Sequence, residues 1–276
     1  DGTPEMVERE FPVATLIRNR ENAGFARANN AGLRLARARY VCLINSDVIV
    51  PPDCLPSMAA YMDANPLVGL LGPRMLDAGG APGPSCMRRP SLRIALVNAL
   101  GLARWFPGSR LHLDNFHSRA VQPVDVLNGW FWMARAEAVD QVGPLGEEFF
   151  MYGEDIDWCD RFWAAGWPVV YFPQASAVHL GGASSARAPL KFYVEMQRAN
   201  MQYWRRRHSL PSRAAYFALA ALHHLVRVAG YGLAFLFRRA KREEAAFKVA
   251  RSCACLSWLA GFRRRPKEAA GAAAVH

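Results

Sequence analysis

Apolar runs and helical stretches alternate along the first part of the chain. Short apolar runs bounded by turn-forming residues predict strands, and stretches with apolar positions three or four residues apart predict helices. The predicted strands are 14–17, 40–44 and 68–71, and the predicted helices are 4–10, 28–38 and 52–64. This alternation is typical of a sheet whose strands are joined through helices, so the sequence predicts an α/β domain.

The middle of the chain interrupts this pattern. Residues 77–91 are rich in Gly, Pro and small side chains, which predicts a mobile loop leading into an irregular stretch up to residue 121. Loops of this kind often close over substrates. The pattern then resumes, with predicted strands at 124–133 and 168–172, predicted helices at 136–142 and 156–165, and a helical stretch beyond residue 185.

The last part of the chain is apolar and basic at once. Residues 214–237 are strongly apolar, but His223, His224 and Arg227 interrupt them. The charge-free runs on either side of Arg227 are shorter than the ~20 residues that a membrane-spanning helix needs, so a helix lying in the membrane interface is favoured. A second amphipathic stretch follows at 247–262.

The positive charge of the chain lies almost entirely in this region. Residues 205–276 hold 15 Lys and Arg and three Glu, a net charge of +12 within a total of +11, so the preceding residues sum to −1. A nearly neutral body with a basic, apolar end suits an anionic membrane better than DNA or RNA, so no nucleic-acid partner is expected. We therefore predict a domain at 1–205 and a tail at 206–276 that contacts a membrane surface. In the alternative, the tail helices pack on that domain and their arginines are solvated.

Cysteine usage and the start of the chain bear on location. The six cysteines show neither CxxC pairs nor the His spacing of a zinc site, so neither a structural metal nor a disulfide framework is predicted. The chain opens at Asp1-Gly2-Thr3 without the basic and apolar pattern of an export signal. We expect a cytoplasmic protein, peripheral on the inner face of the cell membrane.

A first candidate for chemistry is Asp47. The run from Asn22 to Gly32, a helix and a strand lead to Asn45-Ser46-Asp47. An Asp at the carboxyl end of a strand, where the chain leaves the sheet, lies where an open α/β fold binds ligands. Its carboxylate can hold Mg²⁺ or Mn²⁺ against a diphosphate. Because Asn-Ser-Asp is also a common turn, Asp47 alone is a weak signal.

A second candidate is a cluster of carboxylates at the start of a predicted helix. Glu154, Asp155 and Asp157 follow the aromatic run from Phe149 to Tyr152. Helix N-termini favour negative charge, so ordinary capping is one interpretation. Aromatic neighbours, which capping does not require, raise the pKa of a carboxylate and suit it to accept a proton near neutral pH. The cluster therefore offers a candidate general base.

A third candidate is His179, in His179-Leu180-Gly181-Gly182, just after a predicted strand. A lone His in such a place is more often structural than a ligand. Its flanking glycines permit close approach of the backbone to a phosphate or a metal, which favours a functional role.

Together these segments resemble the rhamnosyltransferase-like branch of the family 2 glycosyltransferases. Members carry an Asn-x-Gly-Phe-Ala-x-x-Asn-Asn-x-Gly segment, an Asn-Pro-Asp metal motif, a Phe-Phe-x-Tyr-x-Glu-Asp-x-Asp segment and a His-x-x-Gly-x-Ser close. The match runs from residue 1 to about residue 205, with order and spacing kept. The resemblance implies a GT-A fold, in which a Rossmann-like, mixed and mainly parallel sheet is flanked by helices, here followed by a helical extension.

The resemblance also implies a role for each matching residue. Asp47 would bind the metal, His179 would contact the metal or the diphosphate, and Asp155 would deprotonate the acceptor hydroxyl. Glu154 and Asp157 would support Asp155 or orient the acceptor, Gly129 would line the acceptor floor, and Asn22, Gly24 and Asn29 would lie near the nucleotide or its phosphates.

The implied reaction is a single in-line displacement that inverts the anomeric carbon, for which one base and one Mg²⁺ or Mn²⁺ ion suffice. The branch favours dTDP-rhamnose as the nucleotide-sugar donor. The basic amphipathic tail suggests a saccharide or lipid-linked acceptor in bacterial envelope polysaccharide synthesis.

The sequence departs from the family pattern in two places. Ser46 replaces the usual Pro and Val48 the usual Thr, which leaves the Asp47 carboxylate in place. In the family, a strand ending in Asp-Asn-x-Ser-x-Asp-Gly-Thr leads into the position of Asp1-Gly2-Thr3. We expect the natural product to be longer by this first nucleotide-binding strand, and the chain as written to be unstable or weakly active.

Two other classes of protein share some of these features. A catalytically inactive, membrane-associated scaffold would bind lipid through residues 214–265 without metal-dependent affinity for a nucleotide. A basic nucleic-acid-binding protein would show a steep salt dependence of oligonucleotide binding, but the neutral body and the lack of a DNA or RNA motif argue against it.

Overall fold

The computed structural model describes residues 2–102, 119–181 and 188–261. The chain divides into two compact units. The first, here called the sheet unit, is formed by residues 1–89 and 114–181, and the second, the helical unit, by residues 90–113 and 182–276. Part of the irregular stretch predicted before residue 121, and the Gly-x-Ser that follows His179, lie outside the described residues.

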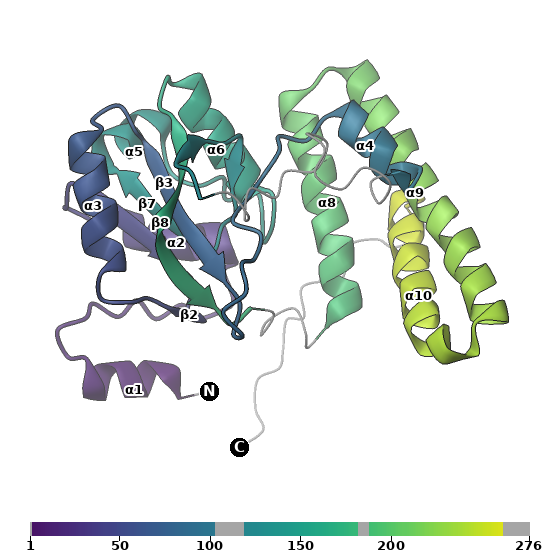
Figure 1. Cartoon of the computed structure of the whole chain (residues 1–276), viewed down its shortest axis with the longest axis horizontal. Coiled ribbons are helices and arrows are strands. Elements are labelled where there is room, and N and C mark those ends of the chain that lie inside the picture. The colour runs from purple at the N-terminus through teal and green to yellow at the C-terminus, as the bar shows by residue number, and fades with distance from the viewer. Residues whose placement is uncertain (1, 103–118, 182–187, 262–276) are drawn as a thin grey trace. The chain divides into compact units, whose positions relative to one another are not determined.

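The sheet unit contains a six-stranded mixed sheet (Figure 1). Strands β1, β7, β3, β8 and β2 lie side by side in that order, and β5 pairs with β8. β3 and β8 run parallel, whereas β7 is antiparallel to both β1 and β3, so β1, β3 and β8 point the same way. Their bounds are β1 Tyr40–Ile44, β2 Val48–Ile49, β3 Leu70–Leu76, β5 Gln122–Pro123, β7 Phe131–Arg135 and β8 Val169–His179. A separate antiparallel pair is formed by β4 Cys86–Met87 and β6 Val126–Leu127.

Side chains alternate between the two faces of this sheet, and each face is covered by helices. Helix α3 (Cys54–Ala64) covers one face with Cys54, Met58 and Met62, which pack against a cluster that includes Leu71 and Met133. Buried apolar area of this kind stabilises the domain by about 25 cal/mol per Å².

The opposite face packs through aromatic rings. Trp132 of β7 is fully buried and lies 5.3 Å, between ring centroids, from Trp158 of α6 (Glu154–Ala164). Phe25, the first residue of α2 (Phe25–Leu33), meets the same Trp132 ring edge-on. Successive residues of β7 therefore anchor α3 on one side and α2 and α6 on the other. Helices α1 (Thr3–Glu10) and α5 (Ala136–Val142) complete the sheet unit.

The helical unit is built from α4 (Leu92–Ala99), α8 (Pro189–Arg207), α9 (Leu210–Phe237), the short 3₁₀ helix η3 (Arg239–Lys241) and α10 (Arg242–Leu259). Helices α9 and α10 lie side by side as a hairpin (Figure 1). Trp204 of α8 stacks on Tyr216 of α9 with ring centroids 4.6 Å apart, which joins these two helices.

The predicted fold class is confirmed, and most predicted elements form within a few residues of their expected bounds. The strand predicted at 14–17 does not form: these residues are coil and largely exposed, with no strand paired to them in the described part of the chain. The strand predicted at 124–133 is divided into β6 and β7 by a turn at 128–130, and a helix, α4, occupies part of the stretch predicted to be irregular.

The division into units also differs from the predicted boundary at 205. Helix α8 runs to Arg207, and its buried residues Met201, Tyr203 and Trp204 belong to the helical unit. Composition changes at about residue 205, but the packing changes earlier in the chain. Residues 90–113 join the same unit from a distant part of the sequence, which composition could not indicate.

Candidate active site at the carboxyl ends of the strands

Asp47 lies in a tight turn that directly follows β1. The backbone N–H of Asn45 donates to the carbonyl of Trp130 at 3.0 Å, and the N–H of Val48 donates to the carbonyl of Asn45 at 3.2 Å. The turn is thus closed on itself and tied to the chain before β7. This fixes Asp47 at the carboxyl end of β1, the edge of a sheet at which open α/β folds bind ligands.

His179 ends β8 and lies next to Asp47. Strand β2 pairs antiparallel with β8 so that Val48 is opposite His179, and the N–H of Leu180 donates to the Asp47 carbonyl at 2.9 Å. The Asp47 Oδ1 and His179 Nε2 atoms are 3.2 Å apart. Both side chains stay partly exposed, at 26% and 18%, so a ligand can reach them.

The ring of His179 rests on Trp130. The two rings are stacked, with centroids 5.7 Å apart and planes 21° from parallel, and Trp130 is almost fully buried. A rigid indole under the imidazole restricts its rotation and keeps Nε2 directed at Asp47. The sequence predicts no role for Trp130; the available signal was its place directly after Gly129, which the resemblance put at the acceptor floor.

Asp155 is held at the start of α6 by backbone donors. Tyr152 and Gly153 both have positive φ, 69° and 86°, which turns the chain sharply into the helix. The N–H of Ile156 donates to Asp155 Oδ1 at 2.9 Å. A non-glycine residue with positive φ is strained, and such strain concentrates at functional sites.

Gly129 lies close to Asp155. A Cβ atom added at Gly129 would be 3.3 Å from the Trp132 ring and 3.6 Å from the Asp155 Cβ. A side chain there would therefore crowd the carboxylate and its approach from solvent. The role of Gly129 at the acceptor floor stays a prediction.

The two carboxyls at the start of α6 differ in protonation. Burial raises the pKa of Asp155 to about 6, with the surrounding backbone N–H groups opposing that rise. Burial, and next to it the charge of Asp155, raises the pKa of Glu154 to about 8. At neutral pH Asp155 is therefore ionised, whereas Glu154 keeps its proton. The buried Glu154 Oε2 has no hydrogen-bond partner in the structure.

Asp157 lies apart from this pair. Its side chain is fully buried and forms an ion pair with Arg161, at 2.9 Å between Oδ2 and Nε. Arg161 also donates to the carbonyl of Val142 at the end of α5. Asp157 thus holds α6 against α5 and supports Asp155 through the helix rather than by contact.

The predicted nucleotide-side residues lie at the start of α2. The Asn22 side chain accepts from the N–H of Gly24 at 3.0 Å, and Asn29 donates to the Phe25 carbonyl within its own helix. Gly24 has a φ of 79°, and a Cβ there would be only 2.5 Å from the Phe150 carbonyl oxygen. This close approach places the Asn22–Gly24 segment beside the turn that carries Glu154 and Asp155.

The segment Gly129–Trp130 connects the two halves of the candidate site. Gly129 lies close to Asp155, since an added Cβ there would be 3.6 Å from the Asp155 Cβ, whereas Trp130 stacks on His179 and its carbonyl accepts from the N–H of Asn45. This short turn therefore lies next to the segments that carry Asp47, His179 and Asp155, which are far apart in the sequence.

Asp47 and His179 are the residues that fit a divalent metal. An oxygen and a nitrogen donor 3.2 Å apart, both partly exposed, suit Mg²⁺ or Mn²⁺, which take one or two protein ligands and fill the rest of their coordination with water and phosphate. No group of three or more His, Cys, Asp or Glu is placed to hold a metal within residues 2–102, 119–181 and 188–261. The pair thus fits a metal shared with a bound diphosphate, rather than one held by the protein alone.

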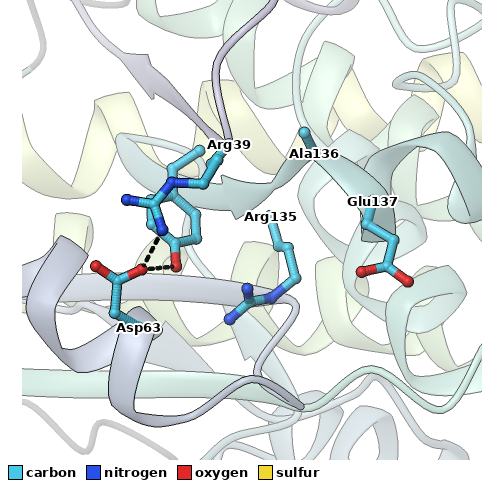
Figure 2. A pocket seen from close by; sticks show the side chains of 6 residues that line it. Arg39, Asp63, Arg135, Ala136 and Glu137 are labelled. Carbon is cyan, nitrogen blue, oxygen red and sulfur yellow. Dashed lines mark hydrogen bonds and ion pairs between the residues drawn. The ribbon is translucent and has the colours of Figure 1, made fainter.

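A hollow of about 410 Å³ lies at the other end of β1, away from Asp47. Figure 2 shows Arg39 directed at Asp63, to which it donates at 2.8 Å; Tyr40 donates to the same oxygen at 2.7 Å. These bonds lower the pKa of Asp63, the bond from Tyr40 most strongly. The ion pair of Arg39 with Asp63 thus connects the start of β1 to the end of α3 beside this hollow.

Comparisons with known proteins bear on the family and the fold of the chain. A model of the "Glycosyl transferase family 2" family matches residues 1–88. The chain is 28% identical over 222 residues to an N-acetylglucosaminyl-diphospho-decaprenol L-rhamnosyltransferase of Mycobacterium tuberculosis, covering 76% of this chain and 72% of that protein. It is 27% identical over 145 residues to a low-salt glycan biosynthesis hexosyltransferase of Haloferax volcanii, covering 51% and 43%.

Among solved structures, the chain is similar to a mannosyltransferase from Pyrobaculum calidifontis in complex with GDP-Man and Mn²⁺. The TM-score is 0.50, the identity is 18%, and the match covers 93% of this chain and 74% of the other. A likeness at this identity bears on the fold, and it agrees with the mixed sheet described above.

Proposed function

Because this chain is a rhamnosyltransferase-like protein of glycosyltransferase family 2, we propose that it transfers a sugar, with rhamnose favoured, from a nucleoside diphosphate to a saccharide or lipid-linked acceptor with inversion. One observation carries the proposal. The Asp47–His179 pair and the Asp155 carboxylate, whose pKa is raised, lie next to the same turn: Trp130 stacks on His179, and Gly129 lies close to Asp155. The Gly129–Trp130 turn thus lies next to both the proposed site for the leaving diphosphate and the proposed base for the acceptor.

Asp155 is the proposed general base. Its pKa of about 6 leaves it ionised at neutral pH yet close enough to neutrality to accept a proton from a hydroxyl in the transition state. The acceptor oxygen attacks the anomeric carbon from the side opposite the diphosphate, the bond to the diphosphate breaks, and the hydroxyl proton passes to Asp155. One base suffices because no covalent intermediate forms.

Glu154 has a supporting role in this scheme. With a pKa of about 8 it is a neutral acid at working pH, so it adds no second negative charge beside Asp155. Its unpartnered Oε2 is free to bond an acceptor hydroxyl. A carboxyl that can both donate and accept suits the orientation of a polyhydroxylated ligand.

Asp47 and His179 are the proposed ligands for Mg²⁺ or Mn²⁺. When bound, the ion neutralises charge that develops on the departing diphosphate. The Trp130 ring keeps His179 aligned for this contact, and the closed turn at Asn45–Val48 does the same for Asp47. The name of the mycobacterial relative includes a rhamnosyl group and a diphospho-decaprenol acceptor, which supports rhamnose, with dTDP-rhamnose as the donor, and a lipid-linked saccharide for this chain.

We further propose that the enzyme works at the inner face of the cell membrane. Helix α9 is long and apolar enough to cross a membrane by length and composition, and only 11% of its most apolar window is buried. Basic residues follow its end, at Arg238, Arg239, Lys241 and Arg242. This arrangement suits contact with anionic lipid. Flotation of the full chain with anionic vesicles tests the contact, and a chain that stays unbound contradicts it.

Asp155→Asn tests the proposed base with little change in shape. We expect transfer to fall by about 10² to 10⁴-fold, because an amide cannot accept the proton. Binding of the nucleoside diphosphate with Mn²⁺ stays at the wild-type level. Asp140→Asn is the matched control, since Asp140 is an exposed residue of α5 in the same unit. Full transfer by Asp155→Asn would contradict the assignment, and transfer lost in both variants would indicate general damage.

A further inference from the structure

Arg227 on α9 and Arg251 on α10 belong to the helical unit, and both are half-buried without a carboxylate partner within the described chain. Among the described residues of this unit the acids are Glu195, Glu243 and Glu244, and Glu195 pairs with Arg198, while Glu244 pairs with Lys248. Glu243 is exposed in the first turn of α10. No ion pair therefore balances either guanidinium within the described chain.

The partners of Arg227 are neutral. Its Nε donates to His223 Nε2 at 2.7 Å, and one terminal nitrogen donates to the Tyr231 hydroxyl at 3.3 Å. His223 Nδ1 lies 3.0 Å from the Asn98 carbonyl oxygen of α4, which can only accept. His223 must then carry its proton on Nδ1 and accept from Arg227 through Nε2, which is the neutral form. Burial, and next to it the charge of Arg227, lowers the pKa of His223 to about 4.

The partner of Arg251 is an aromatic ring. Its guanidinium carbon lies over the Tyr193 ring, 4.2 Å from the centroid. Such a contact attracts the cation but leaves its full charge in place. Arg251 also lowers the pKa of His223 and of His224, as Arg227 does, so the two guanidiniums act on the same pair of imidazoles.

A third cation lies along the same hairpin. The ammonium of Lys248 is 4.9 Å from the centroid of the Tyr231 ring, whose hydroxyl accepts from Arg227. Tyr231 thus lies between Arg227 and Lys248. Arg251 is three positions after Lys248 on α10. The charge of Lys248 is paired with Glu244, so Arg227 and Arg251 are the cations on this part of the α9–α10 hairpin that have no carboxylate partner within the described chain.

Gathering like charges in a half-buried place is unfavourable unless an anion compensates them. Guanidinium groups donate two parallel hydrogen bonds to the oxygens of a phosphate, and they are less strongly hydrated than ammonium groups, so they suit partly buried phosphate sites. The adjoining surface of α9 is apolar, with exposed Leu225, Val226 and Leu233. A phosphate attached to an apolar chain satisfies both features.

We propose that Arg227 and Arg251 form a phosphate-binding site on the helical unit, and that this site takes the phosphate groups of a membrane lipid. The shared chemistry is a phosphate ester or diphosphate on an apolar chain. Two sources have this chemistry, the diphosphate of a polyisoprenyl-linked acceptor and an anionic phospholipid. The first source rests on the proposed function, whereas the phosphate site itself does not.

The test measures binding of the full chain to three vesicle types. These are phosphatidylcholine alone, phosphatidylcholine with a minor fraction of polyisoprenyl diphosphate, and phosphatidylcholine with phosphatidylglycerol at matched surface charge. Soluble inorganic pyrophosphate provides a lipid-free probe. Arg227→Met and Arg251→Met keep the length of each apolar stem and remove the charge, and Arg227→Lys keeps the charge but loses the planar fork.

Each Met variant is expected to weaken binding of the phosphate-bearing probes about tenfold, as loss of a charge-assisted bond implies. The affinity of Arg227→Lys for these probes is expected to lie between that of Arg227→Met and that of the wild type. Arg205→Met, at an exposed arginine of α8, is the matched control and binds as wild type. Circular dichroism of each variant verifies that its helices are intact.

The vesicle types separate the sources. Stronger binding to polyisoprenyl diphosphate than to phosphatidylglycerol identifies the lipid-linked acceptor, and equal binding to both identifies anionic phospholipid; either outcome supports the site. Wild-type binding by both Met variants overturns the proposal, as does an equal loss in Arg205→Met, which would show a diffuse charge effect. Asp155→Asn should bind every probe normally, so failure of the transferase proposal is distinguishable from failure of this one.

Discussion

The sheet unit and the helical unit bury charged groups in opposite ways. In the sheet unit the carboxylates of Asp157 and Asp155 each have a partner: Asp157 has the Arg161 guanidinium, and Asp155 has the N–H of Ile156. In the helical unit the half-buried charges of Arg227 and Arg251 are basic and meet neutral rings and hydroxyls. A charge whose partners are all built into the protein serves structure or catalysis, whereas a charge without a counter-ion suits a ligand that supplies one.

The largest expected effect is in the sheet unit, at Asp47. We expect Asp47→Ala to lower transfer by about 10³-fold, because the diphosphate loses metal-mediated stabilisation worth several kcal/mol. Calorimetric titration of dTDP with Mn²⁺ provides a readout besides transfer, and its metal-dependent binding should disappear. Arg227→Met, in the helical unit, should keep that binding. If Asp47→Ala binds dTDP with Mn²⁺ as wild type does, Asp47 is not a ligand of the metal, and the assignment of this site to the sheet unit is contradicted.

The site residues in the sheet unit could be predicted from the sequence because topology determines where they lie. Asp47 follows β1 and His179 ends β8, and these strands point the same way, so their placement at one edge of the sheet follows from the pattern of elements. The closeness of Asp155 to Gly129 is seen only in the structure. The ion pair of Asp157 with Arg161 could also have been found, since the two residues are four apart on one helix.

Other features could not be predicted because they depend on contacts between distant segments. The apolar run at 14–17 has strand composition, but a strand also needs a neighbour with free backbone groups, and none pairs with it among the described residues. Arg227 looked in the sequence like an interruption of an apolar helix. Its bond to His223, and through His223 to Asn98, depends on α4, which enters the helical unit from another part of the chain.

Stability measurements sharpen the contrast between the two kinds of buried charge. Asp157→Ala should lower the free energy of unfolding by about 3 to 5 kcal/mol, because Arg161 is left buried without its counter-ion. Arg251→Met should change it by no more than about 1 kcal/mol, since no carboxylate loses a partner and the Met side chain keeps most of the packing. Urea unfolding of both variants at neutral pH measures the difference. Equal losses would mean that Arg251 is compensated within the fold.

The smallest expected effect concerns the protonation of Glu154. Its pKa rises from 4.5 to about 8 on folding, chiefly through burial, so the folded state keeps a proton that the unfolded state releases between these values. The free energy of unfolding should therefore fall as pH rises through this window, with Asp155 adding to the fall between 3.8 and about 6. Glu154→Gln cannot ionise, so it should lose less stability than wild type between pH 6 and about pH 9, by roughly 2 kcal/mol. If the free energy of unfolding depends on pH in the same way for the two proteins, Glu154 is not held protonated in the folded state. The proposal that Glu154 is a neutral acid beside Asp155 would then be wrong.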